Sequence, residues 1–222
     1  MGKGFKLAIV FLLALLTIAL IAMVELFDVA PIGPNGTEIG FSHLNGAVRD
    51  AVGSSTTWYQ ITELLGVVAI LTVGVFGLLG IIQWIRRKSL WKVDRKILFL
   101  GGLYIAMAVL YILFEKVVIN YRPILMPGET EPEASFPSSH SMLVLVVMGS
   151  AMLMLPDYIK NRPVRIALQC VCALILVVTV VGRLISGAHW LTDIAGGILI
   201  GSLLLAIFSL LTENLSPYKN SK

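Results

Sequence analysis

Apolar residues run along the chain in long, nearly uninterrupted blocks. A helix needs roughly 20 apolar residues to cross the hydrocarbon core of a bilayer. Six blocks reach or approach that length, the fourth only when its polar start is counted. The pattern therefore predicts an all-α integral membrane bundle of six transmembrane helices, at residues 5–26, 59–84, 97–119, 141–155, 166–184 and 190–211.

The composition agrees with a membrane protein. Hydrophobic residues make up 57% of the chain and charged residues only 14%, whereas about a quarter of the residues in a soluble domain are charged. No segment is long or polar enough for a separate soluble domain, so we expect residues 1–222 to form one membrane-embedded domain. The net charge of +4 is typical of basic cytoplasmic loops and indicates no nucleic-acid partner.

The loops between the predicted helices alternate in charge. Segment 86–96 holds six basic residues against one acidic residue, and segment 157–165 holds three against one. Basic loops belong in the cytoplasm, whereas the other loops are acidic or nearly uncharged. One topology satisfies every loop, with both termini in the cytoplasm of a multi-pass cell-membrane protein.

Most of the chemically unusual residues fall at the predicted extracytoplasmic ends of the helices. They lie in FEKVVINYRP (114–123), PSSH (137–140) and GRLISGAHWLTD (182–193), which hold two of the three histidines. A single interfacial Arg or His is often a side chain that only reaches toward lipid head groups. Several ionisable residues at one membrane face instead indicate a functional site. The set comprises Arg122, His140, Arg183, His189 and Asp193.

These residue types are suited to phosphate chemistry. Arg122 and Arg183 carry planar, permanently charged groups that match phosphate oxygens. Ser138 and Ser139 follow Pro137 at the start of a helix, where hydroxyls and free backbone N–H groups add an anion cradle. The sequence therefore predicts a phosphate-binding site.

The two histidines near this site predict catalysis. His189 and Asp193 are four residues apart, so the carboxylate can hold one ring nitrogen protonated and leave the other as a nucleophile. His140 is then available as an acid. This pairing indicates a phosphomonoesterase or pyrophosphatase that uses no metal, because no carboxylate cluster in the sequence indicates a metal site. We expect no cofactor.

The motifs resemble a known family. RP at 122–123, PSSH at 137–140 and the R-x5-H-x3-D pattern that ends at Asp193 are similar to the signatures of the type 2 phosphatidic acid phosphatase superfamily, and they lie within 116–193. This superfamily includes lipid phosphate phosphatases and bacterial undecaprenyl pyrophosphate phosphatases. The resemblance implies that His189 forms a phosphohistidine, Asp193 orients it and His140 is the general acid. It also implies a set of phosphate-binding residues, namely Arg122, Arg183, Ser138, Ser139 and Lys116.

The first motif departs from the family pattern. The family has a lysine seven positions before the arginine, but here Glu115 stands there and Lys116 lies six positions before Arg122. On a regular helix seven residues return to within about 20° of the same face, whereas six end about 120° away. Lys116 is therefore expected to reach the site only if the helix is irregular or has ended. Ser139 and Gly182 also replace the usual Gly and Ser.

The resemblance implies hydrolysis of a lipid phosphate or pyrophosphate head group at the outer membrane face, with the lipid chain left between helices. Undecaprenyl pyrophosphate is the first choice, because its recycling needs phosphate removal on that face. Phosphatidic acid and phosphatidylglycerol phosphate are alternatives with the same chemistry. A non-catalytic phospholipid-binding or transport protein is a further alternative, although binding needs only the arginines. A vanadate-dependent oxidant enzyme is disfavoured, because nothing indicates a soluble, oxidant-resistant shell. The sequence does not set the oligomeric state.

Three weaker signals remain. Glu63 lies just inside the second predicted span, and an intramembrane carboxylate is a candidate functional residue. Gly197 and Gly201 form a GxxxG pattern, which favours helix packing over an oligomer contact. Residues 44–52 are compatible with a short amphipathic helix that lies on the membrane over the site.

Overall fold

The computed structural model describes residues 2–125 and 129–215. The predicted single domain, 1–222, therefore includes residues 1, 126–128 and 216–222, which lie outside the described residues. The described ranges form seven α-helices and two short 3-10 helices, and within them extended segments pair only through isolated bridges. The elements are α1 (Lys3–Leu26), η1 (Pro34–Gly36), α2 (Ser42–Val52), α3 (Thr56–Arg87), η2 (Leu90–Lys92), α4 (Arg95–Lys116), α5 (Ser139–Tyr158), α6 (Arg162–Ile185) and α7 (Leu191–Thr212).

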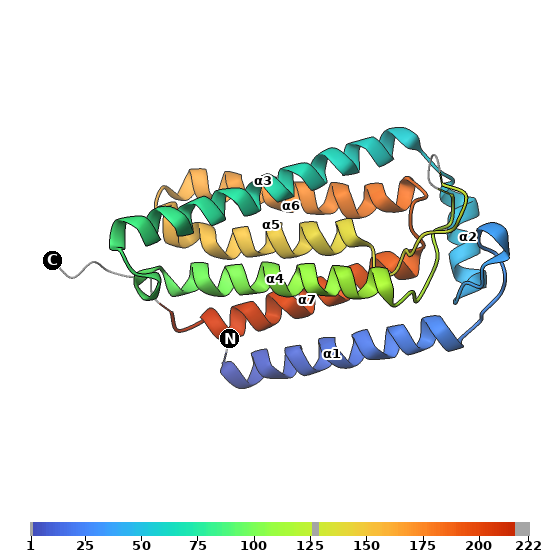
Figure 1. The fold of residues 1–222 in the computed structure, drawn as a ribbon, viewed down its shortest axis with the longest axis horizontal. Helices are drawn as coiled ribbons and strands as arrows, with labels where there is room; N and C mark the ends of the chain where they lie inside the picture. Colours follow the sequence, from blue (N-terminus) through green and yellow to red (C-terminus); the bar gives the residue numbers. More distant parts are fainter. Residues whose placement is uncertain (1, 126–128, 216–222) are drawn as a thin grey trace.

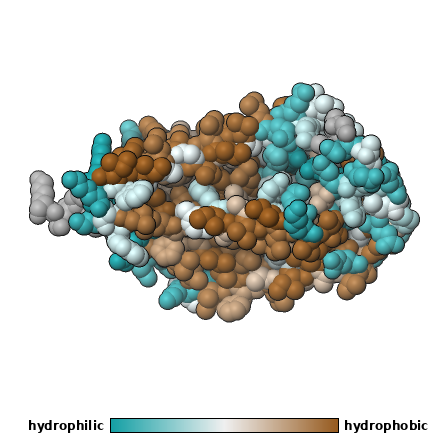
Figure 2. Space-filling view, viewed as in Figure 1, coloured by the Kyte–Doolittle hydropathy of each residue, from teal (hydrophilic) through white to brown (hydrophobic). Residues whose placement is uncertain are grey.

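Six of these helices, all except α2, are long and apolar enough to cross a membrane. They run side by side along the molecule, and α2 lies across one end (Figure 1). Hydrophobic residues cover the middle of the molecular surface, while hydrophilic residues gather at both ends (Figure 2). The predicted all-helical architecture with six spans is confirmed, and the chain is a multi-pass membrane protein.

Helix α5 forms the centre of the bundle. It contacts α3, α4, α6 and α7. In its most apolar stretch 56% of the residues are buried, compared with 6% in the peripheral helix α1. The glycines of α7 allow close packing on α5, because a Cβ at Gly201 would lie 2.6 Å from Leu145 and one at Gly197 would lie 2.7 Å from the Ser138 carbonyl oxygen. The GxxxG pattern therefore packs two helices of the same chain together.

The end of α4 corrects one predicted boundary. The sequence predicted that the third span continues to residue 119, but α4 ends at Lys116 and Val117 is extended (φ −101°, ψ 90°). Beyond it, Tyr121 pairs with Ala134 in an isolated antiparallel bridge, and the Ser135 N–H donates to the Asn120 carbonyl at 2.9 Å. Pairing with a distant segment thus ends the helix before its apolar residues do.

The described ends of the chain lie at the end of the bundle opposite α2 (Figure 1). Lys6 Nζ at the start of α1 lies 3.2 Å from Glu213 Oε1, just beyond α7. This end also carries the basic loop between α3 and α4. That it faces the cytoplasm remains a prediction from the loop charges.

Helix α2 covers the connection between α6 and α7. Its buried Asn45 side chain donates from Nδ2 to Thr192 Oγ1 at 2.9 Å, and the Arg49 guanidinium lies 5.6 Å from the centre of the Trp190 ring. The helix predicted at 44–52 is thus present, and it closes the end of the bundle that holds the candidate site.

Candidate functional site

Three connecting segments and the ends of three helices meet beneath α2. The antiparallel pairing of residues 120–122 with 133–135 places Arg122 beside the residues that precede α5. Arg183 ends α6, and His189 lies in the turn before α7. Residues separated by more than 60 positions in the sequence therefore surround one small region.

The His189 ring has a defined tautomer. Its Nδ1 lies 3.1 Å from the Ser135 carbonyl oxygen, which can only accept, so Nδ1 carries the hydrogen. Its Nε2 lies 3.3 Å from Arg183 Nη2, which can only donate, so Nε2 presents a lone pair. Burial, and then the positive charges of Arg183 and Arg122, hold the pKa of His189 well below its usual value. The imidazole is therefore neutral, as a nucleophile requires.

Asp193 organises the segments around His189. Its Oδ2 accepts hydrogen bonds from Ser135 Oγ at 2.7 Å and from the Trp190 N–H at 2.9 Å, and its Oδ1 accepts from Asn120 Nδ2 at 3.2 Å. The distance from Oδ2 to His189 Nδ1 is 3.9 Å, too long for a hydrogen bond. The carboxylate therefore acts on the ring through Ser135, whereas the sequence suggested direct contact.

Arg183 is almost completely buried, with 1% of its surface exposed, against the first turns of α3. Its Nη1 donates to Glu63 Oε1 at 2.9 Å and to Thr62 Oγ1 at 3.2 Å, and the guanidinium lies 5.0 Å from the centre of the Tyr59 ring. Helix α3 approaches closely because residue 182 is glycine: a Cβ there would lie 2.6 Å from Thr62 Cγ2. This packing fixes the direction of the guanidinium.

His140, in the first turn of α5, also faces α3. Its Nε2 lies 3.4 Å from Glu63 Oε1, and its Nδ1 is buried without a hydrogen-bond partner in the described part of the chain. The ring fits against Gly66, where a Cβ would come within 2.9 Å of it. Glu63 therefore contacts both Arg183 and His140.

Several buried donors at this site have no acceptor among the described residues. They are Nε and Nη1 of Arg122 and Nε of Arg183. Arg122 Nε lies 2.9 Å from Glu133 Oε2, but it counts among the unpaired donors because this ion pair lacks hydrogen-bond geometry. Leaving a buried donor unpaired costs roughly 1–3 kcal/mol, and more for a charged group, so this arrangement is suited to binding an anion.

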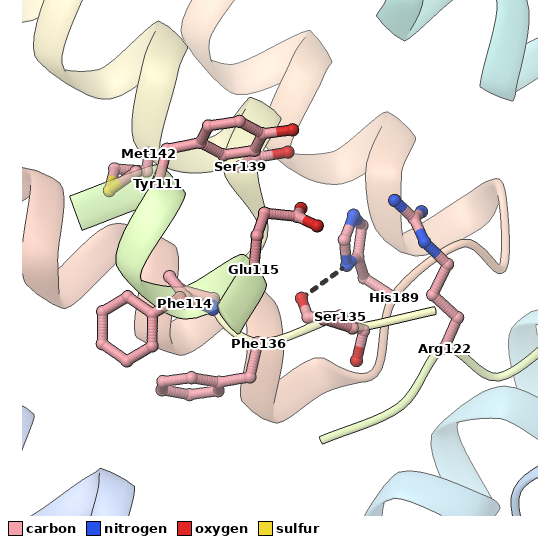
Figure 3. Close-up of a pocket in the computed structure, with 11 residues that line it drawn as sticks. Tyr111, Phe114, Glu115, Arg122, Ser135, Phe136, Ser139, Met142 and His189 are labelled. Carbon is pink, nitrogen blue, oxygen red and sulfur yellow. Dashed lines mark hydrogen bonds between the residues drawn. The ribbon is translucent and has the colours of Figure 1, made fainter. Parts of the chain in front are cut away.

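The two serines before His140 have different surroundings. Ser138 is fully buried; its N–H donates to the Asp193 carbonyl at 2.9 Å and its hydroxyl accepts from Ser141 Oγ at 3.0 Å. Ser139 lines a small pocket together with His189 and Arg122 (Figure 3). Of the two, Ser139 lies where a ligand would contact it.

Lys116 lies apart from this site. Its side chain is exposed at the last position of α4, it lines neither of the cavities beside the two histidines, and it has no hydrogen bond or ion pair among residues 2–125 and 129–215. Glu115 lines the small pocket instead, and Figure 3 shows its carboxylate directed toward the same space as His189 and Arg122. The neighbour of the predicted lysine therefore occupies the site.

A larger cleft of about 390 Å³ opens beside His140, between α3, α4 and α5. Glu63, Ser139 and His140 lie along it, and most of its other lining is apolar, with Val67 and Ile70 exposed on the outer surface of α3. The remaining apolar lining residues include Met107, Ala108, Met142 and Leu143. A polar head group and an apolar chain can both find matching surfaces here.

Sequence reasoning did not assign several residues that hold the site together. Ser135 and Asn120 flank the recognised motifs, and their signal is a polar residue at the boundary of an apolar span. Tyr59 and Thr62 precede Glu63 by four residues and by one, so the signal was a polar cluster inside the second span. In the described ranges no three His, Cys, Asp or Glu residues are grouped to hold a metal ion.

Comparison with known proteins agrees with the motifs. The family model described as the PAP2 superfamily matches residues 116–217. The chain is similar to the crystal structure of the first transmembrane PAP2 type phosphatidylglycerolphosphate phosphatase from Bacillus subtilis, with a TM-score of 0.67, 18% identity, and coverage of 96% of this chain and 98% of that chain. At this identity the likeness shows a shared fold, and no curated protein matches the chain. The match to the family model thus covers residues 116–217, the part of the chain that carries the three motifs.

Proposed function

We propose that the protein is a membrane lipid phosphatase that hydrolyses a lipid phosphate or pyrophosphate head group through a phosphohistidine. The observation that carries this proposal is the group of buried arginine donors without acceptors on Arg122 and Arg183. They lie around a neutral His189 whose Nε2 lone pair faces Arg183. The match of residues 116–217 to the PAP2 superfamily model supports the same reaction class.

In the first step, His189 Nε2 attacks phosphorus. An N–P bond forms while the bond from phosphorus to the leaving oxygen breaks, and protonated His140 gives its proton to that oxygen. Arg122 and Arg183 stabilise the negative charge on the phosphoryl oxygens. Because Arg183 Nη2 lies only 3.3 Å from Nε2, the phosphoryl group displaces this contact as it enters.

In the second step, water attacks the phosphohistidine. The N–P bond breaks, His140 takes the proton from the water, and inorganic phosphate is released. The Ser135 carbonyl keeps the hydrogen on Nδ1 throughout, so the same nitrogen attacks and leaves. Asp193 acts as a positioning residue by holding Ser135 and Asn120. No step needs a metal ion.

The cleft between α3, α4 and α5 is the proposed place for the first part of the lipid chain. Its polar end at Glu63 and His140 is continuous with a mainly apolar lining, which matches a lipid phosphate near the membrane surface. Undecaprenyl pyrophosphate remains the first choice from the sequence. The similar structure is described as a phosphatidylglycerolphosphate phosphatase, so phosphatidylglycerol phosphate is the second candidate.

Phosphate release by the purified protein tests the reaction. We expect release from undecaprenyl pyrophosphate, phosphatidylglycerol phosphate or phosphatidic acid, with equal rates in EDTA and in Mg²⁺, and no release by His189→Gln. The preferred lipid is the one with the highest kcat/KM. Binding of these lipids without release would instead indicate a non-catalytic lipid-binding or transport protein, and loss of activity in EDTA would contradict a metal-independent reaction.

The proposed extracytoplasmic location of the site is tested by cysteine labelling. In a background with Cys170 and Cys172 replaced by serine, a membrane-impermeant thiol reagent applied to intact cells is expected to label Glu131→Cys and to spare Lys92→Cys. Glu131 lies at the end of the bundle that carries the site, and Lys92 lies in the basic loop at the other end. The reverse labelling would place the site in the cytoplasm.

A further inference from the structure

One face of α3 reaches the centre of the site from outside the signature motifs. Tyr59, Thr62, Glu63 and Gly66 occupy positions i, i+3, i+4 and i+7, which share one side of a helix. All four precede residue 116, where the match to the family model begins. This face packs against the buried arginine of α6 and the histidine of α5.

The Glu63 carboxylate lies between the two groups that the proposed reaction needs. Its Oε1 accepts a hydrogen bond from Arg183 Nη1 at 2.9 Å and lies 3.4 Å from His140 Nε2. During the proposed reaction, Arg183 would donate to a phosphoryl oxygen and His140 to the leaving oxygen. A carboxylate and a phosphate are both anionic acceptors, so they compete for the same donors.

We propose that Glu63 is an internal anion that occupies Arg183 when no substrate is bound and competes with phosphate for it. The carboxylate gives up its contact with Arg183 when the lipid phosphate binds and stays at the polar end of the cleft, beside Ser139 and His140. It returns after hydrolysis and weakens the hold of the site on inorganic phosphate. This inference rests on the proposed function, because it assigns a role within the same phosphate site.

Glu63 and Arg183 differ in burial, as the replacement of the carboxylate by phosphate at Arg183 requires. The Glu63 side chain is 43% exposed and lies at the polar end of the cleft with Ser139 and His140, so it can leave Arg183 without entering an apolar interior. The Arg183 side chain is 1% exposed and is also held by Thr62 and the Tyr59 ring. The arginine therefore stays in place while the carboxylate moves.

Replacing Glu63 with glutamine tests the competition. Glutamine keeps the size of the side chain but removes its charge, so it competes less well for Arg183. Hydrogen bonds to charged groups are stronger than hydrogen bonds between neutral groups. We therefore expect Glu63→Gln to bind inorganic phosphate about tenfold more tightly than the wild type. Damage to the site would weaken phosphate binding, so tighter binding distinguishes competition from a structural role.

The measurement is the Kd for inorganic phosphate, obtained from the rise in Tm of the full-length protein in detergent as phosphate replaces chloride at constant ionic strength. Glu63→Ala is the second variant, and the same decrease in Kd is expected for it. Glu63→Asp keeps the charge and is expected to remain closer to the wild type. Glu131→Gln is the matched control, because Glu131 is exposed at the same end and has no hydrogen bond or ion pair within the described ranges.

The outcomes separate this inference from the proposed function. If phosphate binding depends on Arg183 but neither Glu63→Gln nor Glu63→Ala binds more tightly, the inference is wrong and the proposed phosphate site stands. If Glu131→Gln tightens binding equally, long-range charge rather than competition is responsible, which also overturns it. Tighter binding without lipid hydrolysis would support the role of Glu63 and contradict the phosphatase. Absence of phosphate binding in every variant would overturn both.

Discussion

The two ends of the bundle both bury polar and charged side chains, but they satisfy them differently. At the end opposite α2, Lys96 Nζ donates to Asp157 Oδ2 at 2.7 Å and Tyr158 Oη donates to Asp94 Oδ2 at 3.1 Å. At the end beneath α2, Arg122 and Arg183 retain buried nitrogens with no acceptor among the described residues.

This difference separates a structural network from a binding site. Paired groups tie α4 to α5 at the first end, and removing either partner leaves the other partly buried without its partner, which destabilises the fold. At the second end, several positive groups converge at a cost to stability that a bound anion would offset. Buried charge by itself therefore does not identify the site, whereas a group of buried guanidinium nitrogens without hydrogen-bond acceptors does.

The largest expected effect is that of His189→Gln, which removes the proposed nucleophile. We expect kcat/KM for lipid phosphate to fall on the order of 10⁴-fold or more, because glutamine has no lone-pair nitrogen to attack phosphorus. No phosphoenzyme is expected when the variant is quenched in acid-free conditions with radiolabelled substrate. The measurements are phosphate release and trapping of the intermediate.

Asp157→Asn at the opposite end is the matched control for His189→Gln. It weakens the charge-assisted bond to Lys96, so we expect a lower Tm and a kcat/KM close to that of the wild type. Similar loss of turnover in both variants, with intact folding in detergent, would show that the two ends do not divide structure from catalysis as we infer.

The next effect is that of Arg122→Ala, which removes one of the two phosphate-binding arginines. We expect kcat/KM to fall roughly 10²- to 10³-fold, the usual cost of removing one group that stabilises transition-state charge. Arg122→Lys keeps the charge but not the planar fork, so it is expected to restore only part of the activity. Full activity of Arg122→Ala would mean that its unpaired donors do not contact the phosphate.

A smaller effect is the pH dependence of stability that His189 contributes. Burial and nearby arginines hold the pKa of folded His189 well below its usual value, whereas the unfolded side chain takes up a proton below about pH 6.5. The unfolded state then binds more protons, so stability falls as the pH drops below 6.5, by up to about 1.4 kcal/mol per pH unit until the folded pKa is reached.

The difference in Tm between the wild type and His189→Gln measures this contribution, because all other titratable groups are shared. We expect the difference to be constant above pH 7. Between about pH 6.5 and 5, the Tm of the wild type is expected to fall relative to that of His189→Gln. A constant difference over the whole range would show that buried His189 titrates normally.

Much of the fold was predictable because membrane spans are governed by length and hydrophobicity. Both ends of every predicted span lie within a few residues of the ends of an observed helix. The fourth span needed its polar start, and α5 indeed begins at Ser139. The error at the end of α4 arose because residues 117–119 are apolar but lie outside the helix, just before residues 120–122 pair with residues 133–135. Such pairing leaves no local signal in the sequence.

The candidate site was predictable to the extent that short motifs carry it. Arg183 and His189 lie within one motif, and the structure brings them into contact. The roles of Ser135 and Glu63 depend on segments far apart in the sequence that meet only in the bundle. The four-residue spacing predicted that Asp193 lies near His189, but only the tertiary structure shows that Ser135 lies between them.

The smallest expected effect is that of Lys116→Ala. Lys116 is exposed, ends α4 and makes no hydrogen bond or ion pair among residues 2–125 and 129–215, whereas Arg122 and Arg183 present buried donors. A flexible, solvated ammonium also loses rotamer entropy when it is fixed on a phosphate. We therefore expect kcat/KM of Lys116→Ala to stay within about threefold of the wild type, as for other exposed charges without a partner.

Glu115→Gln is the informative companion, because Glu115 lines the small pocket with Arg122 and removing its charge is expected to lower KM for an anionic head group. Steady-state hydrolysis by both variants measures these effects. A loss in Lys116→Ala as large as that in Arg122→Ala would show that residues 117–121 rearrange when substrate binds and carry the lysine to the phosphate.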